Sequence, residues 1–437
     1  MPQFLSTLDA DFESRFADLL GQNREDAPEV DDIVAEIIQD VRNRGDGAVI
    51  ELTAKFDRFD LTPETMAFSA NEIASECQKV SASERDALVL AADRIQAYHA
   101  RQMPEDANWV DDTGATLGWR WTPVASAGLY VPGGLASYPS SVLMNAIPAQ
   151  VAGVENLVIC VPTPDGLVNP LVLLAAELAG VKTVYRIGGA QAIAALAYGT
   201  QTVSPVDKIT GPGNAYVAAA KRRVFGHVGI DMIAGPSEIL IIADRHNDPD
   251  WLALDLLSQA EHDENAQSIL ITNDADFGQF VAEAVTARLQ TLKRRDIAAA
   301  SWRDFGAVII VRDMGEAAAL SDRIAPEHLE LCVQYPEPLA ENIRHAGAIF
   351  MGNQTPEAIG DYVAGPNHVL PTARSARFSS GLSVLDFMKR TTLTKLSPSS
   401  MAAIGPAAAI LAKSESLQAH GLSVQARLDR INSGGKR

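Results

Sequence analysis

The sequence predicts an α/β fold built on doubly wound parallel sheets. Three observations support this class. Short apolar runs alternate regularly with helical segments from residue 127 onwards. Glycine turns follow several of these runs. Residues 239–272 read as a complete strand–helix–strand unit, whose crossover should be right-handed and whose two strands should be parallel and buried.

Helices are expected to precede the first sheet. Residues 1–24 carry an approximately helical apolar stripe and predict an N-terminal helical arm that needs a surface to pack on. Further helical segments follow at residues 31–41, 47–56 and 72–101. The first part of the chain is therefore expected to be rich in α-helix.

Strands and helices then alternate over residues 127–225. We expect strands at residues 127–131, 157–161, 183–187 and 206–210. Helices should occupy residues 140–154, 169–179, 190–198 and 214–225. Ligands on such sheets usually lie at the carboxyl ends of the strands, beside the turns that follow.

Three glycine turns follow strands in this region. They are residues 132–134 (PGG), 188–189 (GG) and 211–213 (GPG). Each can bring backbone N–H groups to a phosphate at a helix N-terminus. None belongs to a G-x-G-x-x-G motif with an acidic residue at the usual distance, so the dinucleotide fingerprint is missing. The turns indicate either a nucleotide-like ligand or ordinary strand-to-helix connections that need glycine.

The helix inside residues 239–272 ends in polar side chains. It should begin at Asp248 and Pro249, a capping side chain followed by a first-turn proline. At its other end Gln259 and His262 are three residues apart and share a face. They can present two donors to one metal ion, or His262 can simply interact with the carbonyl groups of the helix C-terminus. Without a CxxC or HExxH motif, the spacing alone leaves both interpretations open.

Glu327 and His328 follow Pro326, which ends a helix, and precede an apolar strand expected at residues 329–333. An adjacent imidazole and carboxylate can serve two proton-transfer tasks, because only histidine titrates near neutrality. The alternative is a solvated loop pair. Residues 360–371 then form a loop dense in polar and turn residues, as functional loops on rigid α/β frames often are.

The chain from Met401 on is expected to be a small helical tail. A helix at residues 405–413 leads to Glu415 and His420, and a last amphipathic helix ends near residue 431. Glu415 and His420 are five residues apart, so they share a face only if a turn separates them. A segment this small cannot form its own core and has to dock elsewhere.

Composition limits the functional classes. The formal net charge of −19 argues against nucleic-acid and anionic-membrane partners, because phosphate binding needs a basic face. Hydrophobic residues make up 47% and charged residues 21%, which suits a globular protein, and no apolar run reaches the length of a membrane span. The scattered Cys77, Cys160 and Cys332 fit the reduced, buried thiols of a cytoplasmic protein. The first residues are acidic and amphipathic, unlike a signal peptide.

Several segments together resemble the histidinol dehydrogenase family. They are DMIAGPSEIL (231–240), LLSQAEHD (256–263), APEHLEL (325–331), GDYVAGPNHVLPT (360–372) and FSSGLSVLDFMKR (378–390), with GLYVPGG (128–134) and GPGNAYVAAAKR (211–222) in agreement. The resemblance covers nearly the whole chain. It implies the last step of histidine biosynthesis, the NAD-dependent oxidation of L-histidinol through L-histidinaldehyde to L-histidine, in which one Zn²⁺ per subunit holds the substrate.

The resemblance also implies roles for individual residues. Glu327 and His328 match the family's catalytic acid–base pair. The implied zinc ligands are Gln259, His262, Asp361 and His420. The implied substrate contacts are Ser237, Gln259, His262, His328, Asp361, Glu415 and His420, and the implied NAD contacts are Tyr130, Gln191 and Asn214. Ser416 is one departure, because the family's Glu-Gly-Leu-x-x-His segment has glycine at this place.

The same resemblance implies two incomplete Rossmann-like domains. The expected division is an N-terminal arm (1–24), a first α/β domain with the zinc and acid–base residues (25–127 with 239–382), a second α/β domain with the nucleotide contacts (128–238) and a dimerisation tail (383–437). It further implies a homodimer in which each tail completes the active site of the neighbouring subunit.

Three other functions deserve comparison. A related zinc- and NAD-dependent dehydrogenase of another small alcohol, such as a sulfopropanediol, shares the scaffold, but Glu415 and the NHVLPT and FSSGLSVLDFMKR segments favour histidinol. A zinc hydrolase would use Glu327 to activate water with no redox partner. A non-catalytic binding protein is disfavoured by the polar groups gathered at strand ends.

Overall fold

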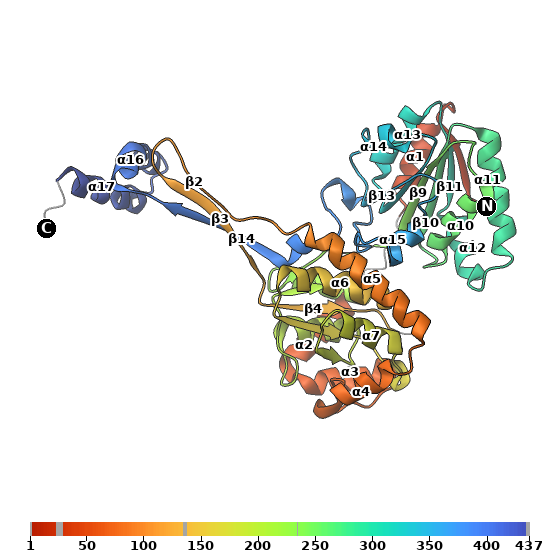
Figure 1. Ribbon diagram of the computed structural model, residues 1–437, viewed down its shortest axis with the longest axis horizontal. Helices are drawn as coiled ribbons and strands as arrows, with labels where there is room; N and C mark the ends of the chain where they lie inside the picture. The colour runs from red at the N-terminus through yellow and green to blue at the C-terminus, as the bar shows by residue number, and fades with distance from the viewer. Residues whose placement is uncertain (1, 23–28, 134–137, 234, 434–437) are drawn as a thin grey trace. The chain divides into compact units, whose positions relative to one another are not determined.

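The computed structural model describes residues 2–22, 29–133, 138–233 and 235–433. The chain divides into a main unit, Met1–Gln102 with Ala125–Phe387, and a tail unit, Met103–Val124 with Met388–Arg437. The main unit holds two parallel sheets and the tail unit holds one antiparallel sheet (Figure 1). The predicted α/β class with parallel sheets is therefore confirmed. Within the described ranges, no helix is both long and apolar enough to cross a membrane.

One sheet of the main unit has six parallel strands. Their order is β1 (Gln3–Ser6), β11 (Ala307–Ile310), β10 (Gln267–Thr272), β9 (Glu238–Ala243), β12 (His328–Cys332) and β13 (Ala348–Met351). Every residue of β9 is buried, and its alternate side chains enter two different cores, as a parallel strand covered on both faces requires. Strands β9 and β10 pair in parallel, which confirms the predicted strand–helix–strand unit.

Helices cover both faces of this sheet (Figure 1). They are α10 (Pro249–Ala260), α11 (Ala275–Leu289) and α12 (Arg295–Asp304) in one core, and α1 (Phe12–Leu20), α13 (Met314–Ile324) and α14 (Pro336–Ala340) in the other. Helix α10 begins as predicted, because the Asp248 side chain accepts a hydrogen bond from the Asp250 N–H at 2.9 Å.

The N-terminal arm differs from the prediction in one respect. Residues 3–6 form strand β1, which pairs with β11 at the edge of the six-stranded sheet, and only the following segment is helical. Leu5, Phe12 and Phe16 are buried in the core of that sheet, so the surface that the arm was expected to need is supplied by its own chain. A four-residue strand is too short for its own pattern to show, and its pairing with β11 decides its conformation.

The other sheet of the main unit has five parallel strands. Their order is β6 (Thr183–Tyr185), β5 (Asn156–Cys160), β4 (Ser126–Tyr130), β7 (Lys208–Thr210) and β8 (Gly229–Ile230), and β4 to β7 confirm the four predicted strands. The chain runs from β4 to β5 and β6 on one side, and then crosses to β7 and β8 on the other. Strands β4 and β7 therefore flank the point where the strand order reverses, which is where such sheets bind ligands.

The helices around the five-stranded sheet come from two parts of the chain. They are α2 (Glu29–Arg44), α3 (Asp46–Asp57), α4 (Ala70–Cys77), α5 (Ala82–Ala100), α6 (Pro139–Ala152), α7 (Pro170–Leu178), α8 (Gly189–Tyr198) and α9 (Ala215–Val224). Buried residues of α2 and α3 share one core with α8 and α9, and α5 packs on α6. The predicted division grouped residues 25–127 with the six-stranded sheet, whereas helices α2, α3 and α5 pack with the helices of the five-stranded sheet. The domain boundaries themselves stay a prediction.

The tail unit combines an antiparallel sheet with a helical hairpin. Strand β3 (Thr116–Pro123) pairs with β2 (Ala107–Val110) and with β14 (Met388–Lys395). Helices α16 (Pro398–Ser414) and α17 (Gln418–Asn432) pack against each other. The two helices agree with the prediction, but the three strands were not foreseen. Strands β3 and β14 pair across a long distance in the chain, and β2 shows little alternation of apolar and polar residues.

Candidate active site

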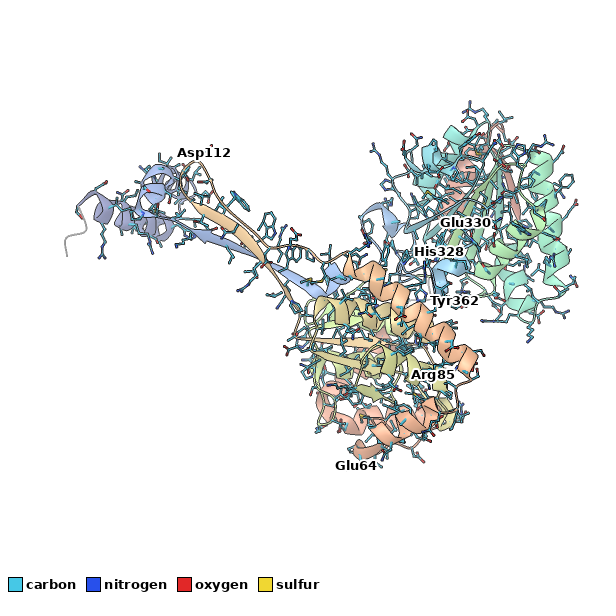
Figure 2. The ribbon with its side chains drawn as sticks, in the orientation of Figure 1. Glu64, Arg85, Asp112, His328, Glu330 and Tyr362 are labelled. Carbon is cyan, nitrogen blue, oxygen red and sulfur yellow. The ribbon has the colours of Figure 1, made fainter. Side chains whose placement is uncertain are left out.

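Polar side chains gather at the amino ends of strands β9 and β12. Glu238 begins β9, His328 begins β12, and the register places His328 opposite Ile239. Helix α10 ends close by, because it leads into the amino end of the adjacent β10. This edge is opposite to the carboxyl ends at which such sheets usually bind ligands. Figure 2 labels His328 and Glu330 on β12.

The two ring nitrogens of the buried His328 have different surroundings. Nδ1 lies 3.0 Å from the carbonyl oxygen of Glu238, which can only accept, so Nδ1 carries the proton. Nε2 has no hydrogen-bond partner among the residues that the structure describes, and it lies 4.0 Å from Oδ1 of Asp361. Burial lowers the pKa of His328 to about 4, although the Asp361 carboxylate acts in the opposite direction. Near pH 7 the ring is therefore neutral, with a free lone pair on Nε2.

Glu327 lies beside His328 and is buried as well. Its Oε2 accepts a hydrogen bond from the Glu238 N–H at 2.8 Å and lies 3.6 Å from His328 Nδ1. The exposed fractions are 6% for Glu327 and 4% for His328, so the alternative of a solvated loop pair was wrong. A buried carboxyl and imidazole held side by side suit acid–base chemistry.

The Gln259 amide faces Glu357, a residue that the sequence analysis did not single out. The Glu238 N–H can only donate, so the Gln259 atom that faces it at 3.2 Å is the amide oxygen. The amide nitrogen then donates to the two carboxylate oxygens of Glu357 at 2.5 and 3.2 Å. Burial raises the pKa of Glu357 well above its usual value, and the neighbouring Asp361 carboxylate adds to this. In the sequence Glu357 looks like any acidic residue in the first turn of a helix, here α15 (Glu357–Tyr362).

Three side chains of the cluster have donor atoms close enough together to hold a metal ion. They belong to His328, Glu357 and Asp361, and these atoms lie within 4.8 Å of one another. Of the four implied zinc ligands, Gln259 and Asp361 lie in this cluster. Imidazole nitrogens and carboxylate or amide oxygens are donors that Zn²⁺ accepts, so the residues present fit the implied metal.

Two more of the predicted residues border the cluster. His262 is exposed just beyond the end of α10. It lies near His328, whose pKa is lowered by burial and lowered further by the charge of a protonated His262. Ser237 directly precedes β9, and its carbonyl oxygen accepts the N–H of Gln267. The His368 ring, which was not singled out, holds the loop around Asp361, because its Nδ1 lies 3.0 Å from the Asp361 carbonyl oxygen.

Glu415 and His420 lie on the helical hairpin of the tail unit. Helix α16 ends at Ser414 and α17 begins at Gln418, so a turn separates the two residues, and both line one hollow of about 640 Å³. Ser416 in this turn has φ 60°, the left-handed conformation that favours glycine. The backbone thus explains why the family pattern has glycine at this place.

Ser416→Gly is expected to raise the stability of the protein. A left-handed conformation costs a non-glycine residue about 1–2 kcal/mol, and the greater freedom of glycine in the unfolded chain takes back about 0.5–1 kcal/mol, which leaves a gain of about 0.5–1 kcal/mol. Thermal unfolding followed by circular dichroism measures the change. Ser423→Gly, at an exposed position inside α17, is the control and should lower the midpoint. An unchanged or lower midpoint for Ser416→Gly would contradict the explanation.

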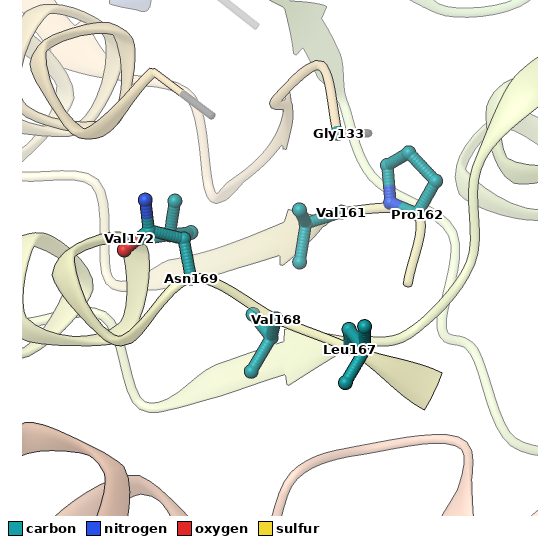
Figure 3. Close-up of a pocket in the computed structure, with 7 residues that line it drawn as sticks. All are labelled: Gly133, Val161, Pro162, Leu167, Val168, Asn169 and Val172. Atoms are coloured by element: carbon teal, nitrogen blue, oxygen red, sulfur yellow. The ribbon is translucent and has the colours of Figure 1, made fainter. Parts of the chain in front are cut away.

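Tyr130, Gln191 and Asn214 lie at the carboxyl edge of the five-stranded sheet. Tyr130 ends β4, and its hydroxyl oxygen accepts the Gly189 N–H at 3.0 Å. Gln191 lies in the first turn of α8, and Asn214 caps α9 by accepting the Val217 N–H at 3.2 Å. A pocket of about 170 Å³ opens at the same edge, beside the turns that follow β4 and β5 (Figure 3).

A buried ion pair holds the turn before Asn214. Lys221 pairs with Asp231, the Lys221 ammonium donates to the Gly211 carbonyl oxygen at 2.9 Å, and Asp231 accepts the Gly211 N–H at 2.8 Å. Gly211 has φ 115°, and a Cβ there would lie 2.0 Å from the carbonyl oxygen of Tyr130. Only glycine fits this position, so the GPG turn is fixed directly against the end of β4.

Comparisons with known proteins show which family this chain belongs to. The family model described as Histidinol dehydrogenase matches residues 20–428. The chain is 74% identical over 432 residues to the histidinol dehydrogenase of Ruegeria pomeroyi, with 99% of this chain and 100% of that protein covered. The chain belongs to the histidinol dehydrogenase family. The crystal structure of the family member from Elizabethkingia anophelis is 37% identical and superposes with a TM-score of 0.94, covering 99% of each chain.

Membership of the histidinol dehydrogenase family confirms the predicted class of function. The chain is an oxidoreductase that acts on a CH–OH group, and its reaction is the last step of histidine biosynthesis. A histidinol dehydrogenase from Cereibacter sphaeroides, 74% identical over 434 residues, supports the same assignment. The rival functions, a sulfopropanediol dehydrogenase and a zinc hydrolase, are not favoured. The roles of individual residues stay predictions.

Proposed function

We propose that the chain oxidises L-histidinol through L-histidinaldehyde to L-histidine, in two successive hydride transfers to NAD⁺. The observation that carries this proposal is the buried, neutral His328, whose Nδ1 proton is fixed and whose Nε2 is free, beside Glu327. When bound, Zn²⁺ supplies a fixed coordination point for the imidazole and amine of the substrate, and NAD⁺ accepts hydride.

The side chains of the chain supply the proton transfers. His328 Nε2 accepts the hydroxyl proton while hydride leaves the carbinol carbon, which gives the aldehyde. Glu327 then accepts a proton from the water that adds to the aldehyde carbon, while protonated His328 gives its proton to the carbonyl oxygen, which gives the hydrate and leaves His328 neutral again. His328 accepts a hydroxyl proton of the hydrate as the second hydride leaves, which gives the carboxylic acid. Because the Glu238 carbonyl oxygen holds Nδ1, the ring enters both oxidations in the same tautomer.

We assign one Zn²⁺ per subunit to Gln259, His262, Asp361 and His420. The donor types support this assignment, since two imidazoles, one carboxylate and one amide oxygen leave room for substrate donors. Ser237 and Glu415 are assigned to the substrate, together with His328 and these four ligands. The positions of Gln259 and Asp361 beside His328 support a site in which the substrate hydroxyl is close to the base.

Tyr130, Gln191 and Asn214 are assigned to NAD. Their place beside β4 and β7 supports this, because strand order reverses there and the N-termini of α8 and α9 offer backbone N–H groups to phosphate. The buried pair of Lys221 and Asp231 gives the site a rigid turn without the usual G-x-G-x-x-G motif.

We further propose a cytoplasmic homodimer whose tails are exchanged. The hairpin leaves Ile410, Leu411 and Leu422 exposed by 66%, 62% and 60%, and an apolar face of this kind is usually covered by a partner. Glu415 and His420 lie on the same hairpin, so a second subunit that covers it also approaches these residues. The N-terminal arm packs on the six-stranded sheet of its own chain, so it does not support an exchange between subunits. The three cysteines are free and buried, in keeping with a reducing compartment.

A complementation experiment tests the shared site. His262→Asn and His420→Asn are each expected to be inactive alone. When the two chains are unfolded and refolded together, each mixed dimer holds one doubly damaged site and one intact site, so activity should partly return. Two portions of the same variant, refolded together, are the control. A mixture that remains inactive although mixed dimers form would refute the exchange of tails.

The proposed reaction is tested by NAD reduction with L-histidinol, followed as NADH absorbance. We expect turnover that is lost after treatment with a chelator and restored by Zn²⁺. A sulfopropanediol should be turned over far more slowly. Equal turnover of both alcohols would contradict the assigned substrate, and an absence of NADH with every alcohol would favour the hydrolase.

A further inference from the structure

Gln259 is the one proposed zinc ligand with two unlike ends. Its amide oxygen has lone pairs that can bind a metal, whereas its NH₂ group only donates hydrogen bonds. A half-turn about the last side-chain bond exchanges these ends with almost no change in shape. The side chain is completely buried, so solvent cannot compensate for a wrong orientation. Contacts inside the protein therefore have to decide which end faces the metal.

Two contacts set the orientation of this amide. The Glu238 N–H donates to the Gln259 oxygen at 3.2 Å, but the same N–H also donates to Glu327 at 2.8 Å, so this contact is shared and long. Glu357 is the stronger constraint, because both of its carboxylate oxygens accept from the Gln259 NH₂ group. The Gln259 oxygen, which can accept two partners, retains one lone pair for a metal.

Glu357 is itself held firmly in place. Its side chain is 2% exposed, and it begins α15 directly after Pro356. Its backbone N–H donates at 2.6 Å to Oε1 of Glu330, which is 1% exposed on β12. The acceptor that faces Gln259 is therefore anchored to the same strand that carries His328.

We propose that Glu357 is a positioning residue, which locks the Gln259 amide with its oxygen directed to the zinc ion. This inference rests on the proposed ligation of zinc by Gln259. Groups that orient a metal ligand in this way typically change metal affinity about 10- to 100-fold when they are removed. Glu357 thus contributes to zinc binding by holding Gln259, without being a ligand.

The test compares zinc dissociation constants, measured by chelator competition on full-length protein without substrate or NAD. Glu357→Leu removes the acceptor and should weaken zinc binding about 10- to 100-fold. Glu357→Gln loses the charge but keeps an acceptor oxygen, so it should remain within about threefold of the natural protein. If Glu357 acted through its charge, both variants would lose affinity alike, and this result would overturn the proposal.

A second background separates orientation from folding defects. Gln259→Glu places oxygen at both ends of the ligand, so no lock is needed there. In that background Glu357→Leu should no longer weaken zinc binding, and it should strengthen it by removing the repulsion between two carboxylates. A loss of the same size in both backgrounds would mean that Glu357→Leu damages the site generally, and the lock would be refuted.

Two controls distinguish this inference from the proposed function. Asp250→Asn removes a half-exposed carboxylate at the opposite end of α10, which pairs with Arg288, and it should leave the zinc dissociation constant unchanged. Gln259→Ala should weaken zinc binding. If it does not, Gln259 is no ligand, and both the assigned ligand set and the lock fail. If Gln259→Ala weakens binding but Glu357→Leu does not, the lock alone fails.

Discussion

His328→Asn is expected to lower kcat for L-histidinol oxidation about 10²- to 10⁴-fold, the usual loss when a positioned base is removed. The asparagine amide can still bond to the Glu238 carbonyl oxygen, but it has no nitrogen lone pair where Nε2 stands. Zinc content should not change, because His328 is not among the assigned ligands. Steady-state kinetics and metal analysis of the purified variant measure the two quantities.

His246→Asn is the matched control for this variant. His246 is an exposed histidine in the loop after β9, at the opposite end of that strand, so its loss should leave kcat unchanged. Near-normal turnover by His328→Asn would remove His328 from the mechanism. A parallel loss of bound zinc would instead identify it as a metal ligand, as its closeness to Glu357 and Asp361 allows.

Glu327→Gln is expected to harm the oxidation of the aldehyde much more than the oxidation of the alcohol. Only the second half needs an activated water, and a glutamine cannot accept the proton of that water. The variant should therefore release or accumulate L-histidinaldehyde, with a loss of about 10²- to 10⁴-fold in the second half. Separate assays that start from L-histidinol and from L-histidinaldehyde measure the two halves.

Glutamine at position 327 keeps an oxygen that can accept the Glu238 N–H, so the local packing should survive. Equal losses in the two halves would argue against the assigned division of labour, since a purely structural defect affects both. Glu316 lies in the first turn of α13, which follows the carboxyl end of β11 and so lies at the edge of the sheet opposite to Glu327. The variant Glu316→Gln changes a carboxylate of the same type there and should affect neither half.

The sequence predicted the regular elements of the main unit well. Strands β4 and β5 lie within one residue of their expected positions, and β9 and β10 lie at the two ends of the expected strand–helix–strand unit. All four are buried apolar runs followed or preceded by clear turn residues. Strand β1 and the tail sheet were missed, because their conformation depends on partners that are distant in the chain.

The candidate site was predictable only in part. Glu327 and His328 were recognisable from their adjacency after Pro326. The spacing of Gln259 and His262 left a metal site as one of two interpretations, and the family resemblance supplied Asp361. Glu357 escaped, since its role depends on the three-dimensional contact with Gln259 rather than on any local pattern. Nor does the sequence show that the six-stranded sheet gathers its polar cluster at the amino ends of β9 and β12.

The yield of NADH from a limiting amount of L-histidinol tests the central claim most directly. With excess NAD⁺ and zinc-loaded protein, two hydride transfers per substrate predict two NADH for each L-histidinol consumed, with L-histidine as the product. One NADH for each L-histidinol, with the aldehyde as the end product, would contradict the proposed use of Glu327 and His328 in a second oxidation at the same site.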